Sequence, residues 1–419
     1  MMQLVIIGGG PAGIEAARTA APHATVKVVT AGAVGEWRPM TMRVWLAAAA
    51  AGERDVAKIV ARANQVATEW QTRCADELAT LEVEIIAGRG RLGKPGEVLV
   101  EPLDGGPTQS LNADAIILAA GAQVAFPEAV APDGERMLTS GDLGVLQTCP
   151  ERVMVLGDGR AGFELCHLFS LLGAEVSWLI PEASPRTHVA PEVDGYLTRM
   201  LERQGVRVVP HTTVQRLAHK GDDVTATLAD GTRYGGAIAL LAFERRPDPT
   251  AVGLSLDLLD TDIYGQTKLR GVYLVGDILT PQAASIAMAQ GRAAALHAVR
   301  RSSAPADIRD IVLTFMYQPQ VAKVGRLTTE GAHGSVTIAL NESMAAHADG
   351  ATEGFLTLAW DHGGYVAGAL AVAPAAAEIL APVAMAMRAG MQLRDLAAIY
   401  GPHPSVSELA AMAARRVEL

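Results

Sequence analysis

Two glycine-rich loops constrain the fold of this chain more than any other feature. The loops span residues 8–13 (GGGPAG) and 157–162 (GDGRAG). Each follows a short apolar run, at residues 4–7 and 153–156, and precedes a stretch of helical composition. A buried strand, a G-x-G-x-x-G loop and a helix in this order are typical of a dinucleotide-binding βαβ unit. We therefore predict two Rossmann-like nucleotide-binding domains.

The glycines of the first loop have separate tasks. Gly8 allows a tight turn, Gly10 lets a pyrophosphate approach the backbone, and Gly13 permits close packing of the helix on the strand. The phosphates are expected at the helix N-terminus, beside Pro11 and Ala12, where N–H groups and the helix dipole favour negative charge. An ordinary glycine turn is the alternative, but the flanking strand and helix favour the nucleotide site.

The ribose position departs from this pattern. The second strand, residues 26–29, normally ends in an acid that bonds the adenosine ribose. Thr30 holds that place here, and the next carboxylate is Glu36. A hydroxyl can bond a ribose without charge, so we interpret Thr30 as a variant ribose contact and not as loss of the nucleotide.

The second loop repeats the arrangement and predicts a nicotinamide-nucleotide site. Its candidate contacts are Gly157, Gly159, Arg160, Ala161 and Gly162. The ribose acid position falls near Ile180, and Glu182 follows two residues later. No arginine cluster suits a 2′-phosphate, although Arg186 lies within reach, so we favour NAD over NADP. A degraded site retained for structure is the alternative.

Composition excludes several classes of protein. Half of the residues are apolar and the formal charge is −10, which argues against disorder and against nucleic-acid binding. Three cysteines, an odd number, suggest a reducing compartment without a disulfide framework. We expect no signal peptide, because residues 1–7 lead directly into the first loop. Prolines and charges interrupt the apolar stretch 364–391, so we expect no membrane span and a cytoplasmic location.

Three later segments fit the same cofactor site. Residues 116–122 are expected to form a buried strand that ends in a small-residue turn. Residues 271–277 are expected to form another, which ends in Gly276-Asp277, and this acid can bond a sugar or ribityl hydroxyl. Residues 281–296 should form a helix whose small side chains allow tight packing beneath a cofactor.

In their order these pieces resemble the class I pyridine nucleotide-disulfide oxidoreductases, such as dihydrolipoamide dehydrogenase, glutathione reductase and mercuric reductase. The first loop resembles the FAD fingerprint of the family, and the second loop, with Glu164, its NAD(P) fingerprint. Residues 311–419 resemble its dimerisation domain, and residues 403–408 (HPSVSE) its closing motif. The positions that correspond to the FAD site are Gly8, Gly10, Pro11, Ala12, Gly13, Thr30, Ala120, Gly121, Gly276 and Asp277.

The resemblance implies an α/β fold with two Rossmann-like dinucleotide-binding domains, for FAD and NAD(P), and a C-terminal α+β dimerisation domain. The FAD domain would be discontinuous, comprising residues 1–148 and 243–310. The NAD(P) domain would span residues 149–242, and the dimerisation domain residues 311–419. A homodimer is expected, because the active site of the family borrows the residue equivalent to His403 from the partner subunit.

The redox-active cysteine pair of the family is missing. The family has C-x-x-x-x-C shortly after the first βαβ unit, with a lysine four residues later. The corresponding positions here are Val34, Pro39 and Arg43, and no shift of one or two residues restores a cysteine. Arg43 is expected to pair with Glu164, as the lysine of the family does, but a guanidinium cannot shed its proton.

The three cysteines present do not replace that pair. Cys74 lies in a predicted helix at residues 57–81, Cys149 precedes the second βαβ unit, and Cys166 lies on the helix after the second loop. None has a C-x-x-C spacing or an evident activating base. We interpret all three as structural residues.

His403 therefore lacks its usual thiol. In the family the equivalent of Glu408 orients this histidine, and the pair is retained here. One hypothesis is that His403 protonates a reduced acceptor such as a quinone oxygen. The alternative is a packing or dimer-contact histidine. The His403–Pro404 bond is a candidate cis peptide. The other histidines show no metal spacing, so no metal site is predicted.

The segment in place of the cysteine pair is rich in large side chains, namely Trp37, Met40, Met42 and Trp45. These side chains could stack on the flavin ring or line an apolar pocket for a flat acceptor. The alternative is that they form a helix face packed into the core.

The sequence leaves two main functions open, with a thiol-disulfide reductase as a minor third. The first is an FAD-dependent enzyme that takes hydride from NAD(P)H and reduces a small non-disulfide acceptor: a quinone, a dye, oxygen or another pyridine nucleotide. The second is a non-catalytic flavoprotein, a redox sensor or partner-binding subunit with a degraded nicotinamide site.

Overall fold

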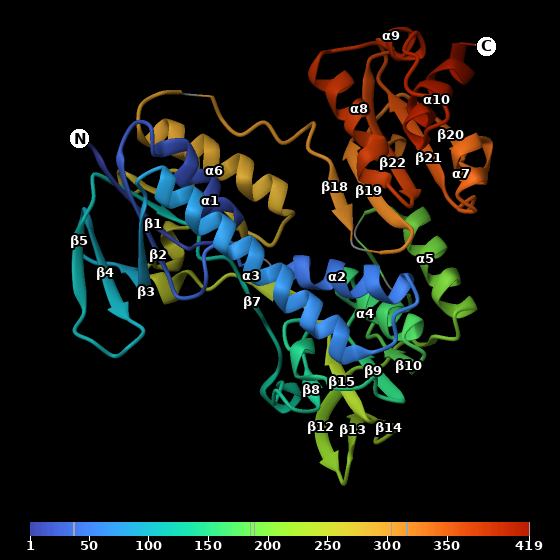
Figure 1. Cartoon of the computed structure of the whole chain (residues 1–419), viewed down its shortest axis with the longest axis horizontal. Coiled ribbons are helices and arrows are strands. Elements are labelled where there is room, and N and C mark those ends of the chain that lie inside the picture. The colour runs from blue at the N-terminus through green and yellow to red at the C-terminus, as the bar shows by residue number, and fades with distance from the viewer. Residues whose placement is uncertain (37, 185, 188, 303, 316, 419) are drawn as a thin grey trace. The chain divides into compact units, whose positions relative to one another are not determined.

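The computed structural model describes residues 1–36, 38–184, 186–187, 189–302, 304–315 and 317–418. The chain divides into two compact units, each built from several segments (Figure 1). The first unit comprises residues 1–41, 61–125 and 244–308. The second comprises residues 42–60, 126–243 and 309–419.

The first unit is built on a seven-stranded sheet whose central strands are parallel. Its order is β17 (Val272–Leu274), β6 (Ala115–Leu118), β1 (Gln3–Ile7), β2 (Thr25–Thr30), β3 (Glu84–Leu92), β4 (Glu97–Pro102) and β5 (Gln109–Asn112). β6 is apolar throughout and β1 is apolar after Gln3, because both faces of the sheet are covered here, and Leu4, Val5 and Ile6 are fully buried. β4 and β5 extend the sheet in antiparallel fashion.

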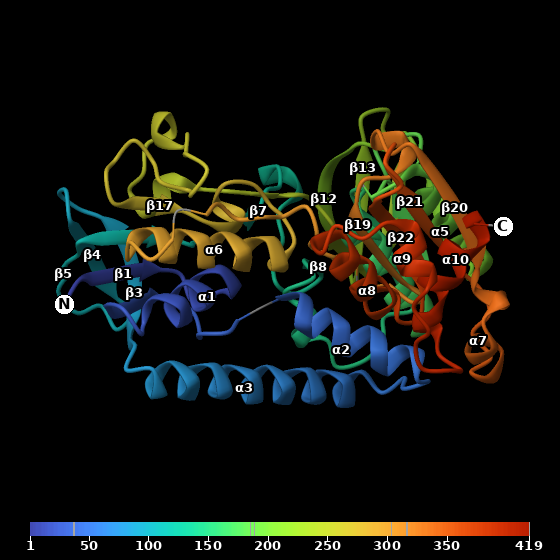
Figure 2. The same ribbon diagram turned by 90° about the horizontal axis from the view of Figure 1, so that it is seen from above.

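Helices α1 (Pro11–Ala20) and α6 (Ala284–Ala298) pack side by side in this unit (Figure 2). Their contact is close because Gly291 lies against the backbone of Ala12, where a Cβ atom would come within 2.3 Å of the carbonyl oxygen. The unit also contains the antiparallel pair β7 (Gln123–Val124) and β16 (Arg245–Arg246). Two helices contribute residues to both units, α2 (Arg38–Ala50) and α3 (Val56–Thr80).

The second unit contains a parallel sheet of five strands. Its order is β11 (Arg207–Val209), β10 (Glu175–Leu179), β9 (Arg152–Leu156), β15 (Ile238–Leu241) and β8 (Met137–Leu138). Helix α4 (Arg160–Leu171) packs against β9 and β10, and helix α5 (Pro191–Arg203) contacts α4. A three-stranded antiparallel sheet follows, formed by β12 (Val214–Lys220), β13 (Asp223–Leu228) and β14 (Arg233–Gly236).

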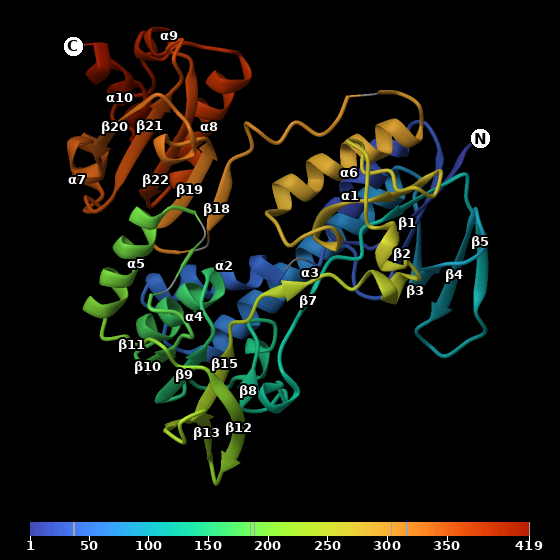
Figure 3. The same cartoon turned by 180° about the vertical axis from the view of Figure 1, so that it is seen from behind.

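The C-terminal part of the second unit is an antiparallel sheet with helices (Figure 3). The strand order is β18 (Leu313–Phe315), β19 (Gln320–Gly325), β22 (Val366–Ala373), β21 (Phe355–Trp360) and β20 (Gly334–Ala339). The helices are α7 (Met344–Ala348), α8 (Ala376–Arg388), α9 (Leu393–Ala397) and α10 (Leu409–Glu418). Short 3-10 turns occur at Glu128–Val130, Leu143–Val145, Pro249–Val252, Leu256–Leu258, Gly276–Ile278, Thr328–Glu330, Leu340–Glu342 and Val406–Glu408.

These sheets confirm the predicted fold class, an α/β chain with two Rossmann-like parts and a C-terminal α+β part. The three domain boundaries given above stay a prediction. Among the described residues, no helix is both long enough and apolar enough to cross a membrane.

Candidate functional site

The first glycine loop lies at the carboxyl edge of the parallel sheet of the first unit. β1 pairs with β6, and β6 pairs with β17, all in parallel. The chain segments that follow these three strands therefore meet at one edge, the position where open α/β sheets bind ligands. These segments are the first loop, the turn at residues 119–121 and the Gly276-Asp277 pair.

The loop is shaped by what its glycines allow. A Cβ atom on Gly8, whose φ is +117°, would lie 2.2 Å from the carbonyl oxygen of Ala119. One on Gly13 would lie 1.9 Å from the carbonyl oxygen of Gly8. A Cβ atom on Gly10 would meet no atom within 4 Å. Gly8 and Gly13 thus serve backbone packing, while the face beside Gly10 is open; its contact with a pyrophosphate stays a prediction.

The N-terminus of α1 suits an anion. Gly10 is the N-cap residue and Pro11 opens the helix, and no side chain of the described residues caps this end. The backbone N–H groups of the first turn, those of Ala12 and Gly13, are therefore directed to the open face. This arrangement fits the pyrophosphate of a dinucleotide.

Thr30 ends β2 and is 9% exposed. Its hydroxyl donates to the carbonyl oxygen of Gly32 at 3.0 Å and accepts from the N–H of Gly32 at 3.4 Å. The side chain that we expected at the ribose is thus engaged in a local turn.

The Gly276-Asp277 pair is held by a polar network that sequence reasoning missed. The N–H of Gly276 donates to Oε1 of Gln290 at 2.9 Å. The carboxylate of Asp277 accepts from the N–H of Gln282 at 3.0 Å and forms an ion pair with Arg245. Asp277 is therefore a fixed, charged acceptor, which suits sugar hydroxyls. No spacing in the sequence signals Arg245, because its pairing depends on where β16 is placed.

The turn after β6 completes this edge. Gly121 has φ +75°, and Ala120 beside it is exposed. A Cβ atom on Gly121 would meet nothing within 4 Å. The turn thus presents open backbone, and its place beside the flavin stays a prediction.

The second glycine loop has the same construction. A Cβ atom on Gly157 would lie 2.8 Å from the carbonyl oxygen of Ala242, and one on Gly162 would lie 2.6 Å from the ring of Trp178. Gly159, with φ +87°, caps α4, and a Cβ atom on it would meet only the carbonyl oxygen of Arg186, at 3.8 Å. Arg160 and Ala161 form the first turn of the helix. The intact construction fits a second dinucleotide.

No carboxylate directly follows β10, where the acid that bonds a ribose is expected. Ile180 is buried, and its carbonyl oxygen accepts from the N–H of Thr212 at 2.8 Å. Glu182 forms an exposed ion pair with Arg186, with Oε2 and an arginine nitrogen 3.7 Å apart. Arg186 also lines a surface hollow with Arg199, Ser184 and Thr198.

The segment 34–43 is described only in part. Trp37 and the side chains of Arg38 and Pro39 lie outside the described residues. Met42 and Trp45 are 4% and 2% exposed, which favours the packing interpretation for these two side chains. Arg43 is exposed on α2, and among the described residues no salt bridge joins it to Glu164 on α4.

The three cysteines are separate and unpaired. Cys74 on α3 and Cys166 on α4 are 1% and 0% exposed, and Cys149 is half-buried. Burial raises the pKa of all three thiols, which disfavours the reactive thiolate.

His403 and Glu408 form the pair that the sequence predicts. Nδ1 of His403 lies 3.0 Å from Oε2 of Glu408, and the N–H of Ser405 donates to Oε1 of Glu408 at 2.8 Å. The Ser405 N–H above all, and His403 second, hold the pKa of Glu408 below its ordinary value. The His403–Pro404 bond is cis, and the imidazole is 63% exposed. The carboxylate thus fixes the ring and leaves Nε2 available.

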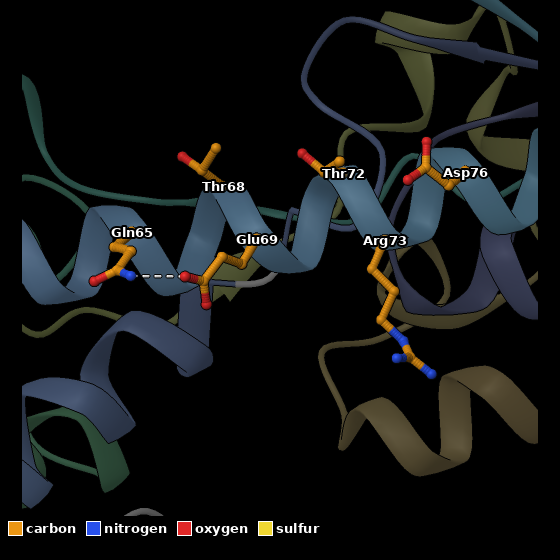
Figure 4. A pocket seen from close by; sticks show the side chains of 6 residues that line it. All are labelled: Gln65, Thr68, Glu69, Thr72, Arg73 and Asp76. Carbon is orange, nitrogen blue, oxygen red and sulfur yellow. Dashed lines mark hydrogen bonds between the residues drawn. The ribbon is translucent and has the colours of Figure 1, made fainter.

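A second surface hollow does not resemble a cofactor site. It lies on α3 and is lined by the side chains of that helix alone (Figure 4). These are Gln65, Thr68, Glu69, Thr72, Arg73 and Asp76. Across the described residues, no group of three or more metal-binding side chains occurs.

Comparisons with known proteins agree with this geometry. The model of the pyridine nucleotide-disulphide oxidoreductase family matches residues 2–291, and that of its dimerisation domain matches residues 311–414. An NAD(P)H dehydrogenase (quinone) from Mycobacterium tuberculosis is 29% identical, over 99% of this chain and 94% of its own length. A dihydrolipoyl dehydrogenase from Zymomonas mobilis is 29% identical, over 84% of this chain and 80% of its own.

Solved structures give the same result. The crystal structure of LpdA from Mycobacterium tuberculosis has a TM-score of 0.93 and 26% identity, with both chains covered completely. The flavoprotein disulfide reductase RclA from Escherichia coli shares the fold, with a TM-score of 0.87 and 20% identity over 99% of this chain and all of its own. The family implies FAD and a pyridine nucleotide as cofactors, and the protein is an FAD-dependent NAD(P)H oxidoreductase. On the evidence of both its domains, the chain belongs to the pyridine nucleotide-disulphide oxidoreductase family.

Proposed function

We propose that this enzyme takes hydride from NAD(P)H and passes the electrons from FAD directly to a small acceptor that is not a disulfide. A quinone is the acceptor that we favour; a dye, oxygen or another pyridine nucleotide belongs to the same chemical class of direct flavin oxidants. The observation that carries this proposal is the cysteine inventory. Three thiols on separate elements, two of them fully buried, leave no dithiol that could relay electrons.

The residues of the first unit fit FAD. The first glycine loop would hold the pyrophosphate, and Asp277 the ribityl hydroxyls, with Ala120 and Gly121 beside the flavin. When bound, FAD supplies the hydride chemistry, and the protein supplies position and electrostatics. The fixed carboxylate of Asp277 and the open face at Gly10 are the structural support for this assignment.

The second glycine loop would hold the pyrophosphate of the nicotinamide nucleotide at Gly159, Arg160 and Ala161. We favour NADH over NADPH, because the carboxylate of Glu182 stands beside Arg186 and would repel a 2′-phosphate. The hollow that Arg186 shares with Arg199 makes NADPH the comparison that must be measured.

His403 is the proposed proton donor to the reduced acceptor. Glu408 accepts from Nδ1 and so directs the second ring nitrogen outward. In a homodimer, the imidazole would serve the site of the partner subunit, as the resemblance to the family implies. Arg43 and Glu164 are proposed as supporting residues on α2 and α4.

The name of one relative supports the choice of acceptor. The Mycobacterium tuberculosis protein that aligns over nearly the whole chain is an NAD(P)H dehydrogenase (quinone). We further propose a cytoplasmic location, because three unpaired cysteines fit a reducing compartment.

Anaerobic stopped-flow mixing with NADH and NADPH tests the proposal. We expect either nucleotide to bleach the visible flavin band, and benzoquinone to restore it at a rate compatible with turnover. Lipoamide and oxidised glutathione should not restore it. If neither nucleotide bleaches the band, the chain is not an NAD(P)H-dependent enzyme, and reoxidation by a disulfide alone would contradict the proposed acceptor class.

A further inference from the structure

The first nucleotide site lacks a carboxylate at the end of β2, where the adenosine ribose of a dinucleotide is normally bonded. Thr30 stands there, and its hydroxyl is occupied by both backbone groups of Gly32. Its proton is therefore committed, and it can offer a ribose hydroxyl one acceptor lone pair but no charge. A different side chain has to serve the ribose, or the ribose has no anionic partner.

The carboxylate of Glu36 lies beside Gly32, in the turn that follows β2. A Cβ atom built on Gly32 would lie 2.5 Å from Oε2 of Glu36. The oxygen therefore lies directly over Gly32, the residue to which Thr30 is bonded. In this conformation the carboxylate occupies the space that a side chain at position 32 would take.

The loop that carries Glu36 is tied to the first glycine loop. The N–H of Gly35 donates to the carbonyl oxygen of Gly9 at 2.9 Å, and the N–H of Glu36 donates to that of Ala33 at 3.2 Å. Val34 packs against the backbone of Gly9 on the same side. These bonds hold the Glu36 backbone next to the loop that receives the pyrophosphate.

Among the described residues, the carboxylate of Glu36 has no cationic partner. In the described part of the chain no salt bridge or hydrogen bond neutralises its carboxylate, although Arg18 and Lys27 of the same unit are each paired with other acids. A carboxylate held over a backbone turn without a cation has its acceptor lone pairs available for hydroxyl donors. The two hydroxyls of a ribose are such donors.

We propose that Glu36 accepts a hydrogen bond from the adenosine ribose of FAD, in place of the acid that normally ends the second strand. This inference rests on the assignment of FAD to the first glycine loop under the proposed function. The position of the carboxylate beside Gly32, at the end of β2, is the observation on which the inference depends.

The test uses the holoenzyme and follows release of FAD on dilution by flavin fluorescence. Glu36→Gln keeps the size of the side chain and removes the charge, and it should weaken FAD binding about ten- to a hundredfold. The matched control is Glu69→Gln, an exposed acid on α3 of the same unit, which should leave the affinity unchanged.

An FAD analogue that lacks the 2′-hydroxyl of the adenosine ribose locates the contact. Wild-type protein should bind this analogue about tenfold or more weakly than FAD, whereas Glu36→Gln, whose neutral amide oxygen is a weaker acceptor, should discriminate less between the two. Circular dichroism and the melting temperature of each variant confirm that the fold is intact.

Two results would overturn the inference. One is unchanged FAD affinity in Glu36→Gln. The other is a variant that still discriminates between FAD and the analogue as strongly as wild type does. Both are distinct from failure of the proposed function, because bleaching of bound flavin by NADH in the wild-type protein is measured independently.

Discussion

At the scale of single residues, the role of Glu408 is to orient the imidazole of His403. Its carboxylate bonds Nδ1 of His403 and the N–H of Ser405, and its pKa is held below the ordinary value. It therefore stays ionised down to pH values where a free glutamate begins to protonate. The charged carboxylate therefore keeps one orientation of the imidazole.

Glu408→Gln should separate the two halves of the reaction. Removal of the charge should slow reoxidation of the reduced flavin by benzoquinone about ten- to a hundredfold, because the oriented proton donor is lost. Reduction of the flavin by NADH should not change. Stopped-flow spectroscopy measures both steps, and Glu378→Gln on α8 is the exposed control. Equal rates of reoxidation in Glu408→Gln and wild type would leave His403 as a packing residue.

Asp133 provides a test of stability against pH. Burial opposes ionisation of its carboxyl, but three backbone N–H groups of residues 135–137 and the ring of His219 outweigh this and lower its pKa to about 2. Because the folded pKa lies below the unfolded one, the stabilisation is present above about pH 4 and is lost as the pH falls towards 2.

Asp133→Asn should therefore lower the free energy of unfolding by about 1–2 kcal/mol at pH 7. The difference from wild type should shrink as the pH drops from 4 to about 2. Urea titrations at several pH values measure it, with the exposed Asp222→Asn as control. A difference that does not depend on pH would show that the carboxylate charge is not the cause.

At the scale of elements, the glycine loop of α1 separates packing from ligand approach. A Cβ atom on Gly13 would overlap a backbone oxygen, whereas one on Gly10 meets nothing within 4 Å. Gly13→Ala should thus destabilise the first unit by about 3 kcal/mol or more.

Gly10→Ala should keep the melting temperature of the FAD-free protein within about 2 °C of wild type but hold FAD at least about tenfold more weakly. Thermal unfolding and FAD content measure these effects. Normal FAD binding in Gly10→Ala would contradict the assignment of the pyrophosphate to the face beside Gly10.

The existence of the nucleotide-binding elements could be predicted from the sequence, because apolar runs and glycine spacings are local signals. Their ends could not. We expected the small-residue helix from residue 281, but α6 begins at Ala284. The N–H of Gln282 is bonded to Asp277 and its side chain to Gln290, and these tertiary bonds keep the segment out of the helix.

Other differences have equally specific causes. We expected the helical stretch to follow the loop at residues 8–13, but α1 begins within that loop, at Pro11, since proline is well suited to the first position of a helix. At the candidate site, the glycine loops and the His403–Glu408 pair could be predicted because spacing in the chain specifies them. The Arg245–Asp277 ion pair joins segments that are far apart in the sequence, and the approach of Glu36 to Gly32 depends on the conformation of the loop after β2. Residue spacing does not specify either contact.

At the scale of the whole molecule, the family match of residues 311–414 implies a homodimer. Several large apolar side chains of this region are exposed in the single chain, including Tyr400 at 84% and Met385 at 66%. We expect sedimentation velocity to show a dimer at micromolar concentration. A monomer would contradict the role of His403 in the site of the partner subunit.

The measurement that tests the central claim most directly is an anaerobic dithionite titration of the holoenzyme, followed through the visible flavin spectrum. If electrons leave the flavin without a disulfide relay, full reduction should consume about one two-electron equivalent per FAD. Consumption of about two equivalents per FAD, with new thiols detected after denaturation, would reveal a second redox centre formed by cysteines and would contradict the account.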